Sequence, residues 1–246
     1  MTSKSSPILG IDPGGTFTDF VYLHQPGAKH QVQVHKVLST PHAPDEAILQ
    51  GIEEMALTES VRSGAILIIH GTTVATNAAL EGKGVRTAYI TNSGLADVLA
   101  IGRQTREELY NLTPDLPKVR FDPSLNLEVD VRLDAKGEVV TPLTPAALKK
   151  LERDVKSLKP EAIAINLLFS YLDPADEMTI EALFQEHFFV SRSSFVLPEI
   201  NEYERGISTW VNSWIGPLIR DYLNSLQRSL APAPLAIMQS SGHTVA

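Results

Sequence analysis

Ten residues near the N-terminus, Gly10 to Asp19 (GIDPGGTFTD), limit the fold of this chain more than any other segment does. The short apolar run Ile8 to Ile11 reads as a strand, Pro13-Gly14-Gly15 as a turn, and Phe17 to Leu23 as a second strand. Glycines lack a Cβ atom and let backbone N–H groups approach a polyphosphate, while an aspartate at a strand end can hold Mg²⁺. Two glycines alone more often form an ordinary hairpin turn, but the ten residues together favour phosphate binding.

Strand-like and helix-like stretches alternate along the rest of the chain, a pattern typical of an α/β protein. Val32 to Leu38 predicts a third strand, which completes a β-meander, and Asp45 to Thr58 has the apolar period of a helix that covers it. The apolar run Ala162 to Phe169 predicts a strand buried on both faces. Glu202 to Leu230 repeats apolar residues every three or four positions and predicts one long helix. Further strands are expected at residues 65–69, 85–91 and 235–239, and a hairpin over residues 128–140.

Residues 113–125 contain three prolines and several charges, a composition typical of an exposed connection between subdomains. We therefore expect three parts: an N-terminal region of residues 1–112, a connection of residues 113–125, and a second α/β part of residues 126–246.

Composition excludes several classes of protein. The chain has no cysteine, so it has no disulfide, no thiolate nucleophile and no cysteine-ligated metal. Lys and Arg number 21 against 29 Asp and Glu, a net charge of −8 without a basic cluster, so nucleic acid is not an expected partner. The apolar runs fall short of the roughly 18 to 20 residues that span a bilayer, and no signal peptide is visible. We expect a cytoplasmic protein with no structural metal.

His70 ends the strand expected at residues 65–69 and is a candidate acid, base or hydrogen-bond donor, because imidazole titrates near neutral pH. A single histidine at a strand end is more often structural. Polar side chains lie beside it in the sequence, and they make a functional role of His70 as good an interpretation as a structural one: Thr72, Thr73 and Asn77.

Arg103 is suited to a bidentate grip on a carboxylate or imide group. An ion pair with Glu107, four residues later, is an equally good interpretation. At the head of the long helix, Glu202, Glu204 and Arg205 offer polar groups, although charge compensation of the helix N-terminus explains Glu204 better.

Five segments, in order, carry a resemblance to a known family. Residues 10–19 resemble the first phosphate-binding motif of the actin, sugar kinase and Hsp70 superfamily, and the form GGTFTD resembles the hydantoinase A/5-oxoprolinase family. Residues 70–78 (HGTTVATNA), 94–104 (GLADVLAIGRQ), 202–217 and 238–242 (MQSSG) are similar to later motifs of that family. Two positions depart from its pattern: Pro13 replaces an aliphatic residue, and Gly242-His243 replaces a glycine pair.

The resemblance implies an actin-like ATPase (ribonuclease H-like) lobe with an opening β-meander, a mixed sheet flanked by helices and a long C-terminal helix. It also implies ATP- and Mg²⁺-dependent opening of a cyclic amide, such as a lactam, a hydantoin or a 5-oxoproline-like ring. Asp12 would serve the metal or the attacking group, and His70 and Arg103 would be catalytic. The phosphate contacts would be Gly14, Gly15, Thr16 and Thr18, and the substrate contacts Thr72, Thr73, Asn77, Gln104, Glu202 and Arg205.

Length leaves the form of the enzyme open. Nucleotide in this superfamily lies between two lobes, and 246 residues account for about one lobe. The chain is then a fragment, or it needs a partner chain that carries the second lobe. Alternatively it is a short enzyme that isomerises, cyclises or hydrolyses a small carbonyl compound without ATP, or a non-catalytic binding or regulatory lobe. An open apolar face would also favour self-association.

Overall fold

The computed structural model describes residues 6–24, 32–40, 44–103, 110, 121–239 and 242–245. Two compact units are present: unit 1 comprises residues 1–77 and 220–246, and unit 2 comprises residues 78–219. The chain leaves unit 1 within helix α3 (Val74–Leu80) and returns to it within helix α8 (Glu202–Leu230). The sequence had suggested a connection at residues 113–125 instead, of which residues 113–120 lie outside the described part of the chain.

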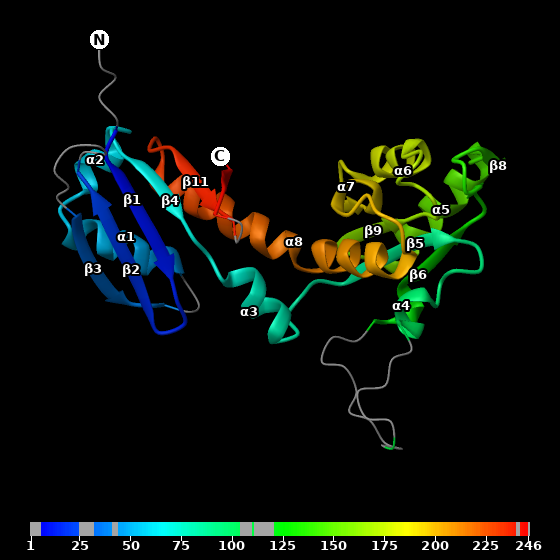
Figure 1. Cartoon of the computed structure of the whole chain (residues 1–246), viewed down its shortest axis with the longest axis horizontal. Helices are drawn as coiled ribbons and strands as arrows, with labels where there is room; N and C mark the ends of the chain where they lie inside the picture. The colour runs from blue at the N-terminus through cyan, green and yellow to red at the C-terminus, as the bar shows by residue number, and fades with distance from the viewer. Residues whose placement is uncertain are drawn as a thin grey trace, which may run out of the picture. The chain divides into compact units, whose positions relative to one another are not determined.

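Unit 1 is built on a six-stranded mixed sheet in the order β12-β11-β4-β1-β2-β3 (Figure 1). The predicted meander is confirmed, because β1, β2 and β3 pair antiparallel in sequence order. Strands β4 and β11 extend the sheet beyond β1, each running parallel to its neighbour. The bounds are Ile8–Pro13 for β1, Phe17–Leu23 for β2, Val32–Leu38 for β3, Leu67–His70 for β4, Leu235–Met238 for β11 and Thr244–Val245 for β12.

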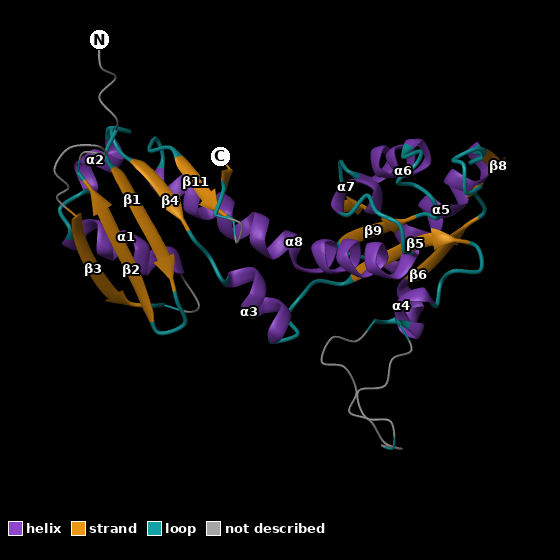
Figure 2. Ribbon diagram, in the orientation of Figure 1, coloured by secondary structure: helices purple, strands orange, loops and turns teal. Residues whose placement is uncertain are grey.

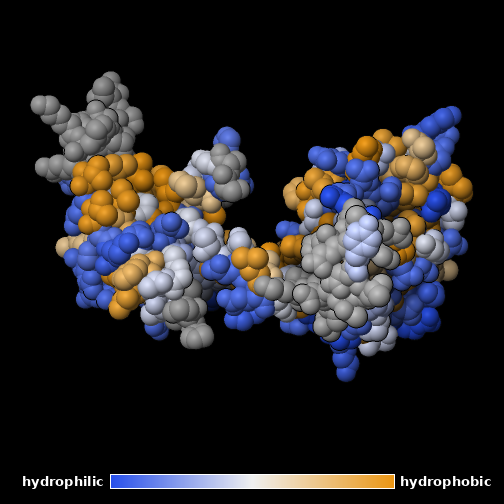
Figure 3. Space-filling view, turned by 60° about the horizontal axis from the view of Figure 1, so that its bottom comes forward, coloured by the Kyte–Doolittle hydropathy of each residue, from blue (hydrophilic) through white to orange (hydrophobic). Residues whose placement is uncertain are grey.

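Helices cover one face of this sheet (Figure 2). Helix α1 (Pro44–Glu54), helix α2 (Thr58–Arg62) and the end of α8 bury alternate strand residues, among them Leu9, Phe20 and Ile68. On the other face, Val21 and Val34 form a cross-strand pair and stay 42% and 67% exposed. Hydrophobic residues accordingly appear on the surface of this unit in Figure 3.

The helix predicted over Asp45 to Thr58 is split in two. Helix α1 ends at Glu54, and Ala56 adopts a left-handed conformation with φ of 56°. The N–H of Leu57 bonds the carbonyl of Ile52, and that of Ala56 the carbonyl of Glu53, which is the pattern of a Schellman cap. Glycine usually occupies this position, so the sequence carried no stop signal here.

Unit 2 contains a parallel sheet in the order β10-β9-β5-β6 and a separate hairpin of β7 and β8. Helices α5 and α6 pack on one face of the parallel sheet, and α4 with the first part of α8 on the other. Strand β9 is buried at every position, which confirms the prediction from its apolar run. The predicted hairpin is shorter than expected because Val129 belongs to the parallel sheet.

The elements of unit 2 have the following bounds: Thr87–Asn92 (β5), Val98–Ile101 (α4), Asn126–Val129 (β6), Arg132–Leu133 (β7), Val139–Thr141 (β8), Pro145–Leu158 (α5), Ala162–Asn166 (β9), Ala175–Phe184 (α6), Phe189–Arg192 (β10) and Ser193–Val196 (α7), with a 3-10 turn at Pro123–Leu125.

The fold class is therefore the predicted one, a mixed α/β protein with a helix-flanked mixed sheet and a long C-terminal helix. Trp210 and Trp214 of that helix stack at a centroid distance of 5.2 Å inside unit 2, so both are core residues. Among the described residues, no helix is long and apolar enough to cross a membrane.

Gly51 of helix α1 gives a test of the packing in unit 1. A Cβ atom at this position would lie 2.2 Å from the ring of Phe20. Overpacking of this kind costs about 1 to 3 kcal/mol, whereas alanine gains about 1 kcal/mol in helix propensity. We expect Gly51→Ala to lower the free energy of unfolding by about 1 kcal/mol in urea titrations. The control is Gln50→Ala at the exposed neighbouring position, where a change within about 0.5 kcal/mol is expected. A stabilised Gly51→Ala variant would contradict this packing.

Candidate active site

The carboxyl ends of β1 and β4 meet at one edge of the sheet in unit 1, because the two strands run parallel. The Gly71 N–H donates to the Ile11 carbonyl at 2.8 Å and carries the pairing past the end of β4. A Cβ atom on Gly71 would lie 3.4 Å from Asp12 Oδ1, an ordinary van der Waals distance, so the Asp12 carboxylate lies close to Gly71. Asp12 is exposed. The edge therefore presents a free carboxylate directly beside the turn that begins at Gly71.

The turn between β1 and β2 lies at the same edge and is open to solvent. Gly14, Gly15 and Thr16 are exposed, and a Cβ atom on Gly15 would meet nothing within 4 Å. The Gly14 N–H is used inside the turn, where it donates to the Phe17 carbonyl at 2.9 Å. Within the described part of the chain, the N–H groups of Gly15 and Thr16 make no hydrogen bond. Both groups are free to bind an anion such as phosphate.

Thr18 does not share this exposure. Its side chain is buried, with 1% of its surface exposed, and its Oγ1 lies 3.0 Å from Ser39 Oγ. The hydroxyl predicted to hold a phosphate oxygen is thus engaged inside the protein. The reason is the strand alternation, which turns Thr18 toward the helix-covered face.

Asp12 is the candidate metal ligand, and its surroundings fit Mg²⁺ better than a metal held by a full protein cage. Among the residues that the structure describes, no three His, Asp or Glu side chains gather into a metal-binding group. Mg²⁺ typically keeps several waters and binds through one or two carboxylates together with substrate phosphates. The exposed Asp12 carboxylate, beside a turn with two N–H groups that are free within the described part of the chain, meets that requirement.

His70 lies in the interior of unit 1. It is 0% exposed, its Nε2 lies 2.8 Å from Tyr222 Oη, and its Nδ1 has no partner within the described residues. Burial lowers the pKa of His70 to about 4 and raises the pKa of Tyr222 to about 12. His70 pairs with Ile11 on the helix-covered face, so Asp12, the next residue along β1, points to the opposite face. The structure therefore does not bring His70 and Asp12 together, and it gives no support to a substrate contact by His70.

The other polar residues after β4 organise the start of helix α3. Thr72 Oγ1 accepts from the Val74 N–H at 3.2 Å, and Asn77 Nδ2 donates to Thr73 Oγ1 at 3.4 Å. Thr73 and Asn77 remain exposed, and Thr72 is half-buried. Of this group, Thr73 and Asn77 are the most accessible to a ligand.

Arg103 lies in unit 2 and is paired with a different residue from the one expected. Its Nε donates to Glu204 Oε1 at 2.6 Å, and its guanidinium carbon lies 6.0 Å from the ring centre of Tyr203. The hydrogen bond from Arg103 lowers the pKa of the Glu204 carboxyl. Glu107, the partner suggested by the sequence, and Gln104, a predicted substrate contact, lie outside the described residues. Arg103 and Glu204 thus form an accessible pair of opposite charge.

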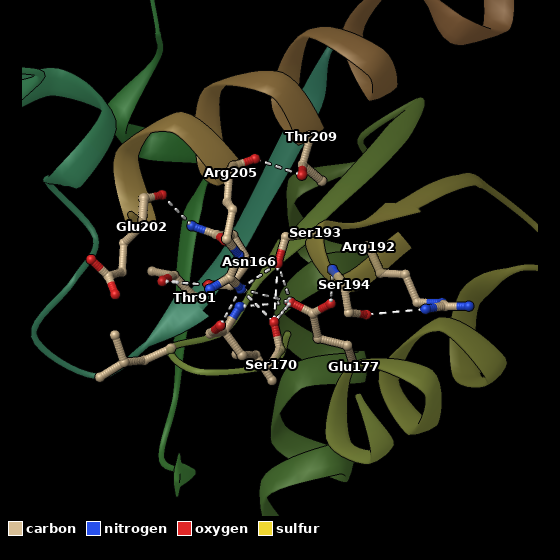
Figure 4. Close-up of polar contacts among 12 residues, drawn as sticks. Thr91, Asn166, Ser170, Glu177, Arg192, Ser193, Ser194, Glu202, Arg205 and Thr209 are labelled. Atoms are coloured by element: carbon tan, nitrogen blue, oxygen red, sulfur yellow. Dashed lines mark hydrogen bonds and ion pairs between the residues drawn. The ribbon is translucent and has the colours of Figure 1, made fainter. Parts of the chain in front are cut away.

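Glu202 begins helix α8 and is half-buried. Its backbone carbonyl accepts from Asn166 Nδ2 at 3.0 Å, which fixes the start of the helix to the end of β9. Its carboxylate makes no hydrogen bond or ion pair with the described residues, and Figure 4 shows this group pointing away from the buried cluster around Arg205.

Arg205 is completely buried in that cluster (Figure 4). Its Nη2 donates to the Leu167 carbonyl at 2.6 Å and to Ser193 Oγ at 2.6 Å. The carboxylate of Glu177, also fully buried, lies 4.0 Å away. It accepts hydrogen bonds from Leu167 N, Ser170 Oγ, Ser193 Oγ and Ser194 N. Arg205 therefore holds the loops at the carboxyl ends of β9 and β10, and its position gives no support to a substrate contact. Glu177 could not be predicted from the sequence, because nothing in the pattern of helix α6 marks a buried acid.

The burial of His70 gives a pH-dependent test. In the unfolded chain its pKa is near 6.5, whereas burial lowers the folded value to about 4. Between these values the unfolded state binds more protons, so the stability attributable to His70 falls as pH falls from about 6.5 to 4 and is constant above this range. The pKa difference between the unfolded and the folded state corresponds to about 3 kcal/mol in the free energy of unfolding.

We expect His70→Gln to be less sensitive than the wild type to a change from pH 7 to pH 4.5, as measured by urea midpoints. His187→Gln, at an exposed position of unit 2, serves as the control and should keep the wild-type pH dependence. Equal pH dependence of His70→Gln and the wild type would show that His70 titrates normally in the folded protein.

With the geometry described, the chain can be compared with known proteins. The model of the hydantoinase/oxoprolinase N-terminal region matches residues 8–188. An uncharacterised protein of Methanocaldococcus jannaschii is 35% identical over 95% of this chain, which corresponds to 35% of that protein. The caprolactamase subunit alpha of Pseudomonas jessenii is 30% identical over 98% of this chain and 36% of the subunit. The 5-oxoprolinase 1 of Arabidopsis thaliana is 32% identical over 94% of this chain and 21% of that protein.

The solved structures agree with these relatives. The crystal structure of the ATP-dependent caprolactamase from Pseudomonas jessenii matches with a TM-score of 0.81 and 30% identity, over 96% of this chain and 36% of that one. The chain spans between about a fifth and just over a third of the length of these relatives. The resemblance found in the motifs is confirmed: the chain belongs to the hydantoinase/oxoprolinase family, and it contains the N-terminal region of that family.

Proposed function

We propose that this chain forms the phosphate-handling N-terminal part of an ATP-dependent hydrolase that opens a cyclic amide. The observation that carries the proposal is the exposed Asp12 carboxylate at the same sheet edge as the open turn of Gly14, Gly15 and Thr16. The name of the relative with a solved structure, an ATP-dependent caprolactamase, supports the reaction class. The rest of the enzyme is supplied by further sequence or by a partner chain.

In this proposal the turn binds phosphate oxygens, and Asp12 holds Mg²⁺ through its carboxylate and bound water. The N–H groups of Gly15 and Thr16 supply donors that need no rearrangement, because no other group in the described chain uses them. ATP, when bound, would supply the phosphoryl group to the amide oxygen with ADP as the leaving group, so that water can attack the carbonyl carbon and phosphate can leave. The contribution of this chain is to orient the phosphates and balance their charge.

Arg103 and Glu204 are our candidates for contact with the cyclic amide. A ring forces its amide into the cis form, which presents a carbonyl acceptor and an N–H donor on one side. The Arg103 guanidinium keeps donors beyond the one that bonds Glu204, and Glu204 has a second carboxylate oxygen as an acceptor. Side by side and accessible, with side chains 63% and 31% exposed, the two groups complement a cis amide.

ATP-independent chemistry is the weaker alternative. It depended on a polar cluster in which His70 contacts the substrate, and His70 is fully buried with a lowered pKa. We therefore retain His70 only as a residue that supports the end of β4.

The role of Asp12 is tested by nucleotide binding. We expect Asp12→Asn to weaken Mg-ATP binding about tenfold or more in isothermal titration, because a charge-assisted ligand to the metal is lost. Binding of ATP in EDTA should change little. The control is Asp19→Asn, which removes a carboxylate of the neighbouring strand that is 2.9 Å from Lys36. Wild-type affinity for Mg-ATP in Asp12→Asn would exclude Asp12 as the metal ligand.

The role of the Arg103 and Glu204 pair is tested with small lactams. We expect 2-pyrrolidone to bind more tightly than N-methyl-2-pyrrolidone, which lacks the amide N–H, in titrations followed by NMR. Glu204→Ala should abolish this preference, since it removes the acceptor for the amide N–H, whereas Arg103→Ala should weaken the binding of both lactams, since it removes the donor to the carbonyl oxygen that both share. Glu152→Ala, at a surface carboxylate paired with Lys156, is the control and should keep it. Equal binding of the two lactams by the wild type would contradict the proposed contact.

A further inference from the structure

The turn between β1 and β2 is held by a residue from outside the motif. Ser39 follows the last residue of β3, which pairs with Phe17 at the turn end of β2. Its Oγ donates to the Gly14 carbonyl at 2.8 Å, and its backbone N–H donates to the Thr16 carbonyl at 2.9 Å. Two carbonyls of this one turn, those of Gly14 and Thr16, are thus tied to one serine.

Fixing a carbonyl also fixes the N–H group of the same peptide unit. A trans peptide is planar, and its C=O and N–H point in opposite directions. The Gly14 carbonyl and the Gly15 N–H belong to one such unit. Because Ser39 holds the Gly14 carbonyl, the Gly15 N–H is directed away from Ser39. Gly15 itself is exposed to solvent.

Thr18 completes the arrangement. Its Oγ1 lies 3.0 Å from Ser39 Oγ, and it is almost fully buried. Since the Ser39 hydroxyl proton is directed to the Gly14 carbonyl, the Thr18 hydroxyl supplies the proton for the contact between the two side chains. Thr18 therefore orients Ser39, which in turn orients the turn.

We propose that Ser39 is a positioning residue for the phosphate group of a nucleotide: it aims the Gly15 N–H at the ligand, and Thr18 supports it from the interior. This inference rests on the proposed function for its ligand, a phosphate oxygen. The orientation of the peptide unit between Gly14 and Gly15 can be measured without any ligand.

The first experiment measures that orientation. Residual dipolar couplings of the backbone amides in the free protein report the direction of the Gly15 N–H bond. We expect Ser39→Ala to change the coupling of Gly15 while residues of the parallel sheet in unit 2 keep theirs. Ser39→Thr retains the hydroxyl and should restore the wild-type coupling. An unchanged Gly15 coupling in Ser39→Ala would overturn the proposal.

The second experiment measures the consequence for binding, with Mg-ATP as the probe. We expect Ser39→Ala to weaken the affinity about tenfold, the effect of about one hydrogen bond, and Ser39→Thr to stay within about threefold of the wild type. Thr18→Val should fall between the two. Equal affinity of Ser39→Ala and the wild type would overturn the positioning role. If the wild type binds no Mg-ATP while the couplings change as expected, the nucleotide function fails and Ser39 is left with a structural role only.

Discussion

The parallel pairing of β1 with β4 is the constraint on which the candidate site in unit 1 depends. Parallel strands end at the same edge of a sheet, so two segments about sixty residues apart in sequence meet there. The register then decides which side chain points where: Ile11 and His70 share the covered face, and Asp12 turns to the open one. A shift of β1 by one residue would turn the Asp12 carboxylate to the covered face.

Several polar residues of the motifs are buried and contact other residues of the chain. Thr18 supports Ser39, His70 contacts Tyr222, and Arg205 joins the loops around Glu177. Burying such groups is costly unless hydrogen bonds satisfy them, and a buried charge is costly even with a partner. Motif residues of this kind hold loops in place, and the polar groups that are accessible to a ligand lie on those loops.

The sequence predicted the elements well because their apolar periods are clear, as in the meander and in α8. It could not predict the break after Glu54, since Ala56 takes a left-handed conformation that usually marks glycine. Nor could it show that His70 and Thr18 are buried, because facing depends on strand register and on which face the helices cover. The partner of Arg103 is Glu204, about one hundred residues away, and local spacing suggested only Glu107. Long-range pairing of this kind leaves no mark in a single sequence.

The uncovered face of the sheet in unit 1 has a practical consequence for solubility. Phe17 lies opposite Leu38 and Val21 opposite Val34, and a single ion pair between Asp19 and Lys36 separates these two apolar rows. Strand β3 is also the outer strand, with backbone groups on one side that no neighbouring strand uses. A net charge of −8 opposes aggregation at long range, but it does not cover these side chains at contact. The outer surface of the first three strands therefore favours association of the isolated chain.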